Sequence, residues 1–95
     1  MKQIKPMRPE ANTASQPLTV QLFAGLAAAA GQRQISVRPA AATVAGVRAA
    51  LATALPAIGP LLARSSLAVD GRYAPEEAAV GPDSEIAVIP PVSGG

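Results

Sequence analysis

The sequence predicts an α+β domain in which one main helix packs across a mixed sheet. Short apolar runs with a period of two flank one longer run of helical period, and turn-forming Gly, Pro and Asp residues separate them. The chain has 95 residues, which suffices for one small domain. Alanine accounts for 22 of its hydrophobic residues, and Phe and Tyr occur once each, so the core must be aliphatic.

Two strands are expected before the main helix. In residues 18–24 every second side chain is a large aliphatic one, which places an apolar face toward the core. An alanine-rich helical turn over residues 25–30 follows and ends at Gly31. Residues 34–38 form the second strand, and the two strands make a hairpin.

The main helix is expected to begin after Thr43, whose hydroxyl can cap the first free amides. Gly46 in this helix is expected to cost roughly 1 kcal/mol relative to alanine. Pro56 ends the regular helix near Leu55, and residues 60–63 form a further turn. Aliphatic residues recur at steps of three and four and give one stripe: Val44, Val47, Leu51, Leu55 and Ile58.

Three further strands are expected after the helix. Residues 67–70 and 72–74 flank the Asp70-Gly71 hairpin turn signal. The last strand covers residues 85–89, and the segment before it is expected to be irregular. The first and last strands are expected to lie side by side in the middle of the sheet.

The distribution of charge excludes some partners. The net charge of +2 belongs to residues 1–16, which hold three basic residues against one acidic, whereas residues 17–95 hold five of each. A folded part without a basic stripe or stacking aromatics is not expected to bind nucleic acid. No apolar run approaches the roughly 20 residues of a membrane helix, so no membrane partner is expected. Residues 1–16 are expected to be a disordered leader.

The side chains offer little chemistry of their own. The absence of Cys and His excludes a thiolate nucleophile, a histidine base and Cys/His metal sites, so no bound cofactor or metal is expected. A small domain without disulfides fits the cytoplasm. The adjacent carboxylates Glu76 and Glu77 are expected to form a solvated turn, and Asp83 and Glu85 a polar edge rather than a metal site.

The informative feature is the C-terminal end. Pro90 and Pro91 stiffen the exit from the last strand, and four small residues follow to the terminal carboxylate. A Gly-Gly end presents no Cβ, so it can thread a narrow channel and let another protein's groups approach the carboxylate. This geometry suits a substrate that is fed into the active site of another protein.

The same segment resembles the end of the MoaD-type sulfur carriers, the small subunits of molybdopterin synthase. The resemblance rests on Val88-Ile89-Pro90-Pro91-Val92-Ser93-Gly94-Gly95. Residues 20–26, ending at Gly31, are similar to the first strand and turn of the family, and Thr43-Val44 and Val69-Asp70-Gly71 match in order. The resemblance covers residues 17–95, with departures at Gly46-Val47 and in the turn over residues 81–85.

The resemblance implies a β-grasp, ubiquitin-like fold over residues 17–91 and a flexible tail over residues 92–95. It further implies that an E1-like enzyme uses ATP to adenylate the carboxylate of Gly95, next to Gly94. Sulfur transfer then gives a thiocarboxylate, which donates sulfur to precursor Z in the large subunit. The chain would thus be a carrier in a heterotetrameric molybdopterin synthase rather than an enzyme, with the catalytic groups on its partners.

A partner surface is expected beside the tail. If alternate residues of the first and last strands face the helix, Phe23 and Ile89 face solvent and form an exposed apolar patch. In the alternative arrangement, Phe23 tucks under the alanine-rich turn. The predicted partner-binding residues are Phe23, Ile89, Pro90, Pro91, Val92 and Ser93.

Other functions remain open at this point. The chain can serve as a sulfur carrier for thiamine or cysteine synthesis, or as a protein modifier joined through Gly95 to lysines. It can also be a plain interaction domain with an incidental tail. The Pro-Pro-Val-Ser spacer before the final glycines favours molybdopterin synthesis.

Overall fold

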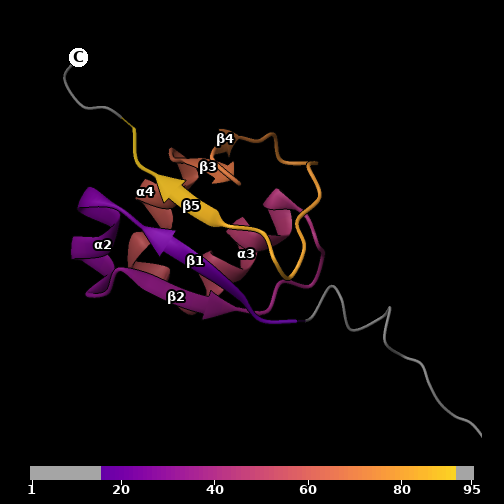
Figure 1. Ribbon diagram of the computed structural model, residues 1–95. Helices are drawn as coiled ribbons and strands as arrows, with labels where there is room; N and C mark the ends of the chain where they lie inside the picture. Colours follow the sequence, from indigo (N-terminus) through magenta and orange to yellow (C-terminus); the bar gives the residue numbers. More distant parts are fainter. Residues whose placement is uncertain (1–15, 92–95) are drawn as a thin grey trace, which may run out of the picture.

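Five strands form one mixed sheet with the first and last strands side by side near its middle (Figure 1). The computed structural model describes residues 16–91. The last strand, β5, runs parallel to β1 and antiparallel to β3, so the predicted adjacency is confirmed. The order across the sheet is β2 (Gln34–Val37), β1 (Leu18–Leu22), β5 (Ile86–Ile89), β3 (Ser66–Val69) and β4 (Arg72–Tyr73).

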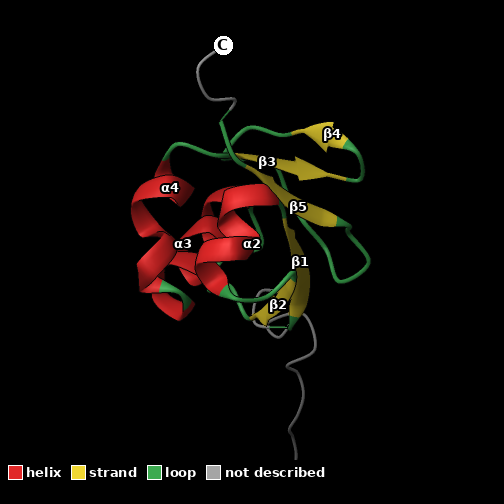
Figure 2. Cartoon of the chain, turned by 90° about the vertical axis from the view of Figure 1, so that its left-hand side faces the viewer, coloured by secondary structure: helices red, strands yellow, loops and turns green. Residues whose placement is uncertain are grey.

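The helices all cover one face of this sheet and leave the other face open (Figure 2). The longest is α3, the predicted main helix, and two shorter helices join it. No single helix within residues 16–91 is long and apolar enough to cross a membrane. Only Val44–Ala54 and Pro56–Ala63 taken together reach that length and hydropathy, and this pair is bent by 115°. The helical bounds are α2 Ala24–Ala30, α3 Val44–Ala54, the 3-10 turn η1 Pro56–Ile58 and α4 Gly59–Ala63.

An aliphatic core fills the space between the helices and the sheet. Burial of each such side chain stabilises the fold by about 1.5–3 kcal/mol. Leu55, predicted in the helical stripe, is only half-buried because α3 ends at Ala54, while Ile58 reaches the core from η1. The largest contributions come from residues that are at most 1% exposed: Val20, Leu26, Val44, Val47, Leu51, Ile58, Leu62, Leu67, Ile86 and Val88.

The start of α3 is closed by hydrogen bonds from two directions. As predicted, the hydroxyl of Thr43 accepts a bond from the amide of Gly46, at 3.1 Å. The amide of Val44 donates to the carbonyl of Ala78 at 3.0 Å, within the segment that was expected to be irregular. That segment contains no regular strand, but it satisfies free amides at the helix N-terminus. The backbone amides at the buried N-terminal end of α3 therefore have hydrogen-bond acceptors.

Gly46 is required by packing, and the expectation that alanine would be better there is wrong. A Cβ built on Gly46 would overlap the backbone carbonyl oxygen of Ala41. The expectation considered only helix propensity. The approach of the loop at Ala41 to α3 cannot be predicted from a local sequence pattern. A side chain at this position would push that loop away from α3.

Several strand ends differ from the predicted ones by one or two residues. β1 ends at Leu22 rather than residue 24, because Phe23 caps α2 and Ala24 adopts a φ of 50°. The predicted hairpin turn is present, with φ values of 53° at Asp70 and 83° at Gly71. Consecutive residues in the left-handed region match the twist of a two-residue hairpin, which explains Asp-Gly at this turn.

Candidate functional site

The open face of the sheet carries the candidate site, and strand pairing fixes which residues are neighbours there. Ile89 of β5 pairs with Ser66 of β3, and Phe23 follows the last residue of β1 on the other side of β5. The next row across the sheet comprises Gln21 on β1, Ala87 on β5, Ala68 on β3 and Tyr73 on β4.

Both aromatic residues of the chain are exposed around this face. Phe23 is 49% exposed and Tyr73 is 71% exposed, and the chain contains no other aromatic side chain. The small side chains of Ala68 and Ala87 lie between them, and the surface is hollowed there by about 460 Å³. Phe23 therefore does not tuck under α2. Exposed aromatics around a hollow are typical of protein interfaces.

Tyr73 was missed by the sequence analysis, although a local signal for it exists. A two-residue turn at Asp70-Gly71 pairs Ala68 with Tyr73. Because Leu67 is buried toward the helices, the next residue, Ala68, and its partner Tyr73 face the open side. We refer to Phe23, Tyr73 and Ile89 together as the sheet-face patch.

β5 carries the chain from the centre of the sheet toward the C-terminal end. Ile86 and Val88 are fully buried, while Ala87 and Ile89 are half-buried on the other face, which confirms the predicted alternation. Pro90 and Pro91 follow the strand and are half-buried. The predicted leader, except Gln16, lies outside the described residues, as do the positions of Val92, Ser93, Gly94 and Gly95, whose roles stay predictions.

Two hydrogen bonds between Asp70 and Glu85 fix the end of the open sheet face that lies opposite the two prolines. The amide of Asp70 donates to the carbonyl of Glu85 at 2.8 Å, and the amide of Glu85 donates to Oδ1 of Asp70 at 2.9 Å. Glu85 also lines the hollow, and Asp83 is exposed. Within residues 16–91, no three acidic side chains converge on a site that could hold a metal ion.

The only ion pair within residues 16–91 joins Arg48 of α3 to Glu76. The hydrogen bond from the guanidinium of Arg48 lowers the pKa of the Glu76 carboxyl from its ordinary value. The prediction of a solvated carboxylate turn is confirmed, since Glu76 and Glu77 are both exposed in a turn, and Glu76 additionally pairs with Arg48 there. Neither Arg48 nor Glu76 lines the hollow, so this ion pair supports the fold rather than the candidate site.

These features define a class of protein. A five-stranded sheet of this order, with its longest helix packed across one face and its C-terminal strand between two neighbours, is the ubiquitin-like β-grasp fold. The prediction from the resemblance is therefore confirmed for the fold.

The sequence profile of the ThiS family matches residues 20–95, and the chain belongs to this family of ubiquitin-like sulfur carriers. SAMP1 from Haloferax volcanii is 33% identical, with a TM-score of 0.70 over 84% of this chain and 100% of that chain. The putative molybdopterin converting factor subunit 1 from Pyrococcus furiosus is 21% identical, with a TM-score of 0.69 over 80% and 98%.

A third similar structure is the complex of subunits 1 and 2 of the molybdopterin-converting factor from Helicobacter pylori. It is 16% identical, with a TM-score of 0.60 over 84% of this chain and 100% of the matched chain. The likenesses to this structure and to the Pyrococcus protein show a shared fold. Together with the family match, they confirm the predicted resemblance to MoaD/ThiS-type carriers, a family of small proteins that are not catalytic themselves.

Proposed function

We propose that this chain is a sulfur carrier for molybdopterin synthesis and that its reactive group is the carboxylate of Gly95. The observation that carries the proposal is the anchoring of β5, which pairs with β1 on one side and β3 on the other. This fixed strand leads directly into Pro90-Pro91, after which the sequence ends in Val-Ser-Gly-Gly. A tail that starts from a fixed strand and two prolines loses less conformational entropy when a partner takes it up.

The proposed chemistry takes place on the last backbone carbonyl. In an E1-like partner, the Gly95 carboxylate attacks the α-phosphorus of ATP and pyrophosphate leaves. Sulfur at the sulfide level then adds to the acyl carbon and displaces AMP, which gives a thiocarboxylate. In the large subunit the thiocarboxylate sulfur bonds to a carbon of precursor Z and displaces an oxygen substituent from it, and water then cleaves the acyl–sulfur bond and restores the carboxylate. The chain needs no thiol for this role, in keeping with its lack of Cys.

The sheet-face patch is the proposed docking surface for the large subunit. It consists of apolar and aromatic side chains next to the strand from which the tail departs, so a partner that contacts it is placed close to Pro90 and Pro91. Aromatic side chains in the centre of an interface supply much of the binding energy. Docking at the patch would thus position the tail in the partner's active site.

A second candidate function is protein modification, with Gly95 joined to lysine side chains through isopeptide bonds. The likeness to SAMP1, a small archaeal modifier protein by name, favours this candidate because it extends to 33% identity over 84% of the chain. Both functions begin with activation of the same carboxylate, and they differ in the nucleophile that receives the acyl group or its sulfur.

The test is the intact mass of the protein isolated from its native host. The proposal predicts a fraction heavier by the difference between one sulfur and one oxygen atom, and co-purification of a molybdopterin synthase large subunit. A chain that lacks Gly95 should show neither the heavier mass nor restored cofactor synthesis. Isopeptide-linked adducts without a thiocarboxylate would support the modifier instead, and full cofactor synthesis without Gly95 would rule out the sulfur-carrier function.

A further inference from the structure

We propose, on the basis of the function proposed above, that the large subunit inserts an arginine side chain into the hollow of the open sheet face and pairs it with Glu85. This sheet-face hollow is the space of about 460 Å³ bordered by Phe23 and Tyr73. Within residues 16–91, Glu85 is the only charged residue that lines it. The charge that a partner meets in the hollow is therefore that of a single carboxylate among apolar and neutral side chains.

The position of Glu85 follows from the alternation along β5. Ile86 is fully buried toward the helices, so the residues on either side of it, Glu85 and Ala87, face the open side. The backbone amide of Glu85 donates to Oδ1 of Asp70 at 2.9 Å, and its carbonyl accepts from the amide of Asp70 at 2.8 Å. Glu85 is thus held by its backbone, and its exposed carboxylate is left to contact a partner.

The carboxylate of Glu85 has no counter-charge of its own. It forms neither an ion pair nor a hydrogen bond with any residue of the part of the chain that the structure describes. Asp70 adds a second negative charge beside it, and Asp83 precedes it by two residues. Arg72 neighbours Tyr73 on β4, and successive side chains of a strand point to opposite faces, so Arg72 lies on the helix side when Tyr73 borders the hollow.

A partner that covers the hollow removes water from this carboxylate. An ionised carboxylate is costly to bury unless an opposite charge and hydrogen-bond donors replace the water. A purely apolar insert would leave Glu85 unpaired, and an acidic insert would be repelled by both Glu85 and Asp70. The side chain that enters the hollow must therefore be a cation.

Arginine fits the sheet-face hollow better than lysine. A guanidinium group is planar, donates two parallel hydrogen bonds to a carboxylate and stacks on aromatic rings. Tyr73, which is 71% exposed, supplies such a ring, and the methyl groups of Ala68 and Ala87 lie between it and the other wall. β4 and β5 are two strand spacings apart, roughly 10 Å, so one guanidinium between them can contact both Glu85 and Tyr73.

The charges at the two ends of the face also select the direction of docking. Ile89 pairs with Ser66 at the end from which the tail departs, and Arg64 is exposed two residues before Ser66. The four residue steps from Glu85 to Ile89 span roughly 13 Å. A partner arginine is attracted at the Glu85 end, whereas in the reversed orientation it would meet Arg64. The favoured orientation places the rest of the partner's interface toward Pro90.

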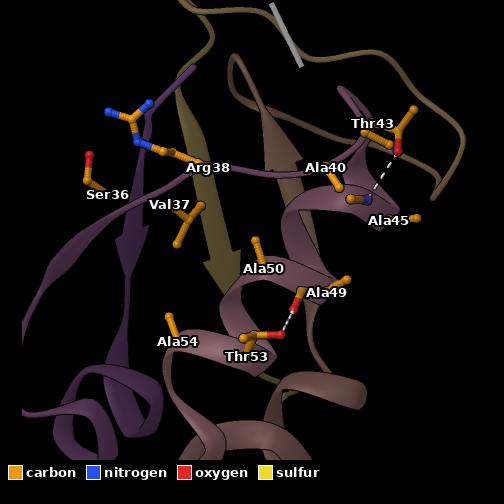
Figure 3. Close-up of a pocket in the computed structure, with 12 residues that line it drawn as sticks. Ser36, Val37, Arg38, Ala40, Thr43, Ala45, Ala49, Ala50, Thr53 and Ala54 are labelled. Atoms are coloured by element: carbon orange, nitrogen blue, oxygen red, sulfur yellow. Dashed lines mark hydrogen bonds between the residues drawn. The ribbon is translucent and has the colours of Figure 1, made fainter. Parts of the chain in front are cut away.

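The groove of about 770 Å³ between β2 and α3 lacks such an unpaired charge (Figure 3). The hydroxyl of Thr43 accepts from the amide of Gly46, and the hydroxyl of Thr53 donates to the carbonyl of Ala49, both at 3.1 Å. Within residues 16–91 no acidic side chain lines this groove, and its one cation, Arg38, already has a partner. The charge that selects the large subunit therefore lies on the open face of the sheet.

The test is titration calorimetry between the full-length chain and the purified molybdopterin synthase large subunit of the native host. Glu85→Gln removes the charge but keeps both backbone bonds to Asp70, and should weaken binding about tenfold. Glu85→Lys sets a cation against the partner's arginine and should weaken it about a hundredfold. The matched control is Asp83→Asn, an exposed neighbour that does not line the hollow and should bind like the native chain.

A double substitution tests whether one arginine contacts both Glu85 and Tyr73. Tyr73→Leu keeps an apolar side chain without the ring and should weaken binding about fivefold, whereas Tyr73→Phe should bind like the native chain. If one guanidinium contacts both residues, Glu85→Gln combined with Tyr73→Leu should lose clearly less than the product of the single losses. Both residues are exposed, so these variants should keep the urea-unfolding midpoint of the native chain.

Three results would overturn the inference alone. These are native affinity of Glu85→Gln, an equal loss from Asp83→Asn, and losses that simply multiply in the double variant. In each case the native chain still binds the large subunit and still carries the thiocarboxylate mass, so the proposed function stands. Failure of the native chain to bind the large subunit would overturn both the arginine pairing and the molybdopterin function.

Discussion

The guanidinium of Arg48 donates to the carboxylate of Glu76, with Nη2 2.7 Å from Oε2, although the two residues lie 28 positions apart. The same guanidinium donates through Nη1 to the backbone carbonyls of Leu62, at 2.6 Å, and Ser65, at 3.0 Å. One side chain of α3 thereby joins the end of α4 and the segment that closes the start of α3. The carbonyls at a helix C-terminus have no partner within the helix, so an external donor stabilises this end.

Replacement of Arg48 should destabilise the protein more than replacement of Glu76. Arg48→Ala removes the guanidinium donor from two partly buried carbonyls, of which Leu62 keeps the amide of Ser65 at 3.0 Å, and should lower the free energy of unfolding by about 1–3 kcal/mol. Glu76→Gln removes the charge from a half-exposed partner and should cost less than about 1 kcal/mol. Urea unfolding of the two variants measures both values, and equal losses would contradict the assignment of the stabilisation to the carbonyl contacts.

The ion pair also gives stability a defined pH dependence. Because the folded pKa of Glu76 is lowered, its contribution is fully present above the ordinary value of 4.5 and is lost as the pH falls through the lowered pKa. The stability difference between the native chain and Glu76→Gln should therefore shrink as the pH falls from neutral to below the ordinary value of 4.5. Urea unfolding across that range checks it, with Glu77→Gln as the matched control at an exposed neighbour that forms no salt bridge.

Two glycine-to-alanine substitutions should change stability in opposite directions. Gly46→Ala introduces a Cβ that collides with the Ala41 carbonyl, and should lower the free energy of unfolding by about 1–3 kcal/mol. Gly25→Ala in α2 places its Cβ 3.6 Å from Leu61, an ordinary contact, and should raise it by up to about 1 kcal/mol. Thermal and urea unfolding measure the sign of the change in the free energy of unfolding for each of the two variants. A gain in stability from Gly46→Ala would mean that the loop at Ala41 moves freely.

The sheet-face patch should contribute to partner binding without contributing to the fold. Phe23→Ala, Tyr73→Ala and Ile89→Asp should each weaken binding of the large subunit, and the two aromatic truncations should cost about 1–2 kcal/mol of affinity. Calorimetry with the purified subunit measures this, and Ala52→Ser on the exposed side of α3 is the control. Unchanged affinity for all three variants, each still folded by circular dichroism, would remove the patch from the interface.

Local patterns in the sequence were sufficient to predict most of the fold. Alternation in β1 and β5 predicted which side chains face the helices, Thr43 predicted the start of α3, and Asp70-Gly71 predicted the β3–β4 hairpin. These signals succeed because each depends on the conformation of a few consecutive residues. The strand ends were less accurate, since Phe23 continues the alternation of β1 but already belongs to the cap of α2.

The candidate site was only partly predictable. Phe23 and Ile89 were identified from strand alternation, because the open face follows once the buried face is known. Tyr73 was missed because its two-residue strand is too short to show a period, and only its pairing with Ala68 places it on the same face. Within residues 16–91, the place of β2 at the edge of the sheet depends on the strand order, which no local pattern contains.

The amino-acid sequence alone determined that this is an aliphatic α+β domain without side-chain nucleophiles of the Cys or His type, ending in prolines and two glycines. Composition and periodicity are properties of the chain itself, so they need no knowledge of distant neighbours. Only the tertiary structure decided that both aromatic residues border one face, that Gly46 must lack a side chain, and that Arg48 joins three segments. Each of these depends on residues far apart in sequence, which become neighbours only when the helices pack on the sheet.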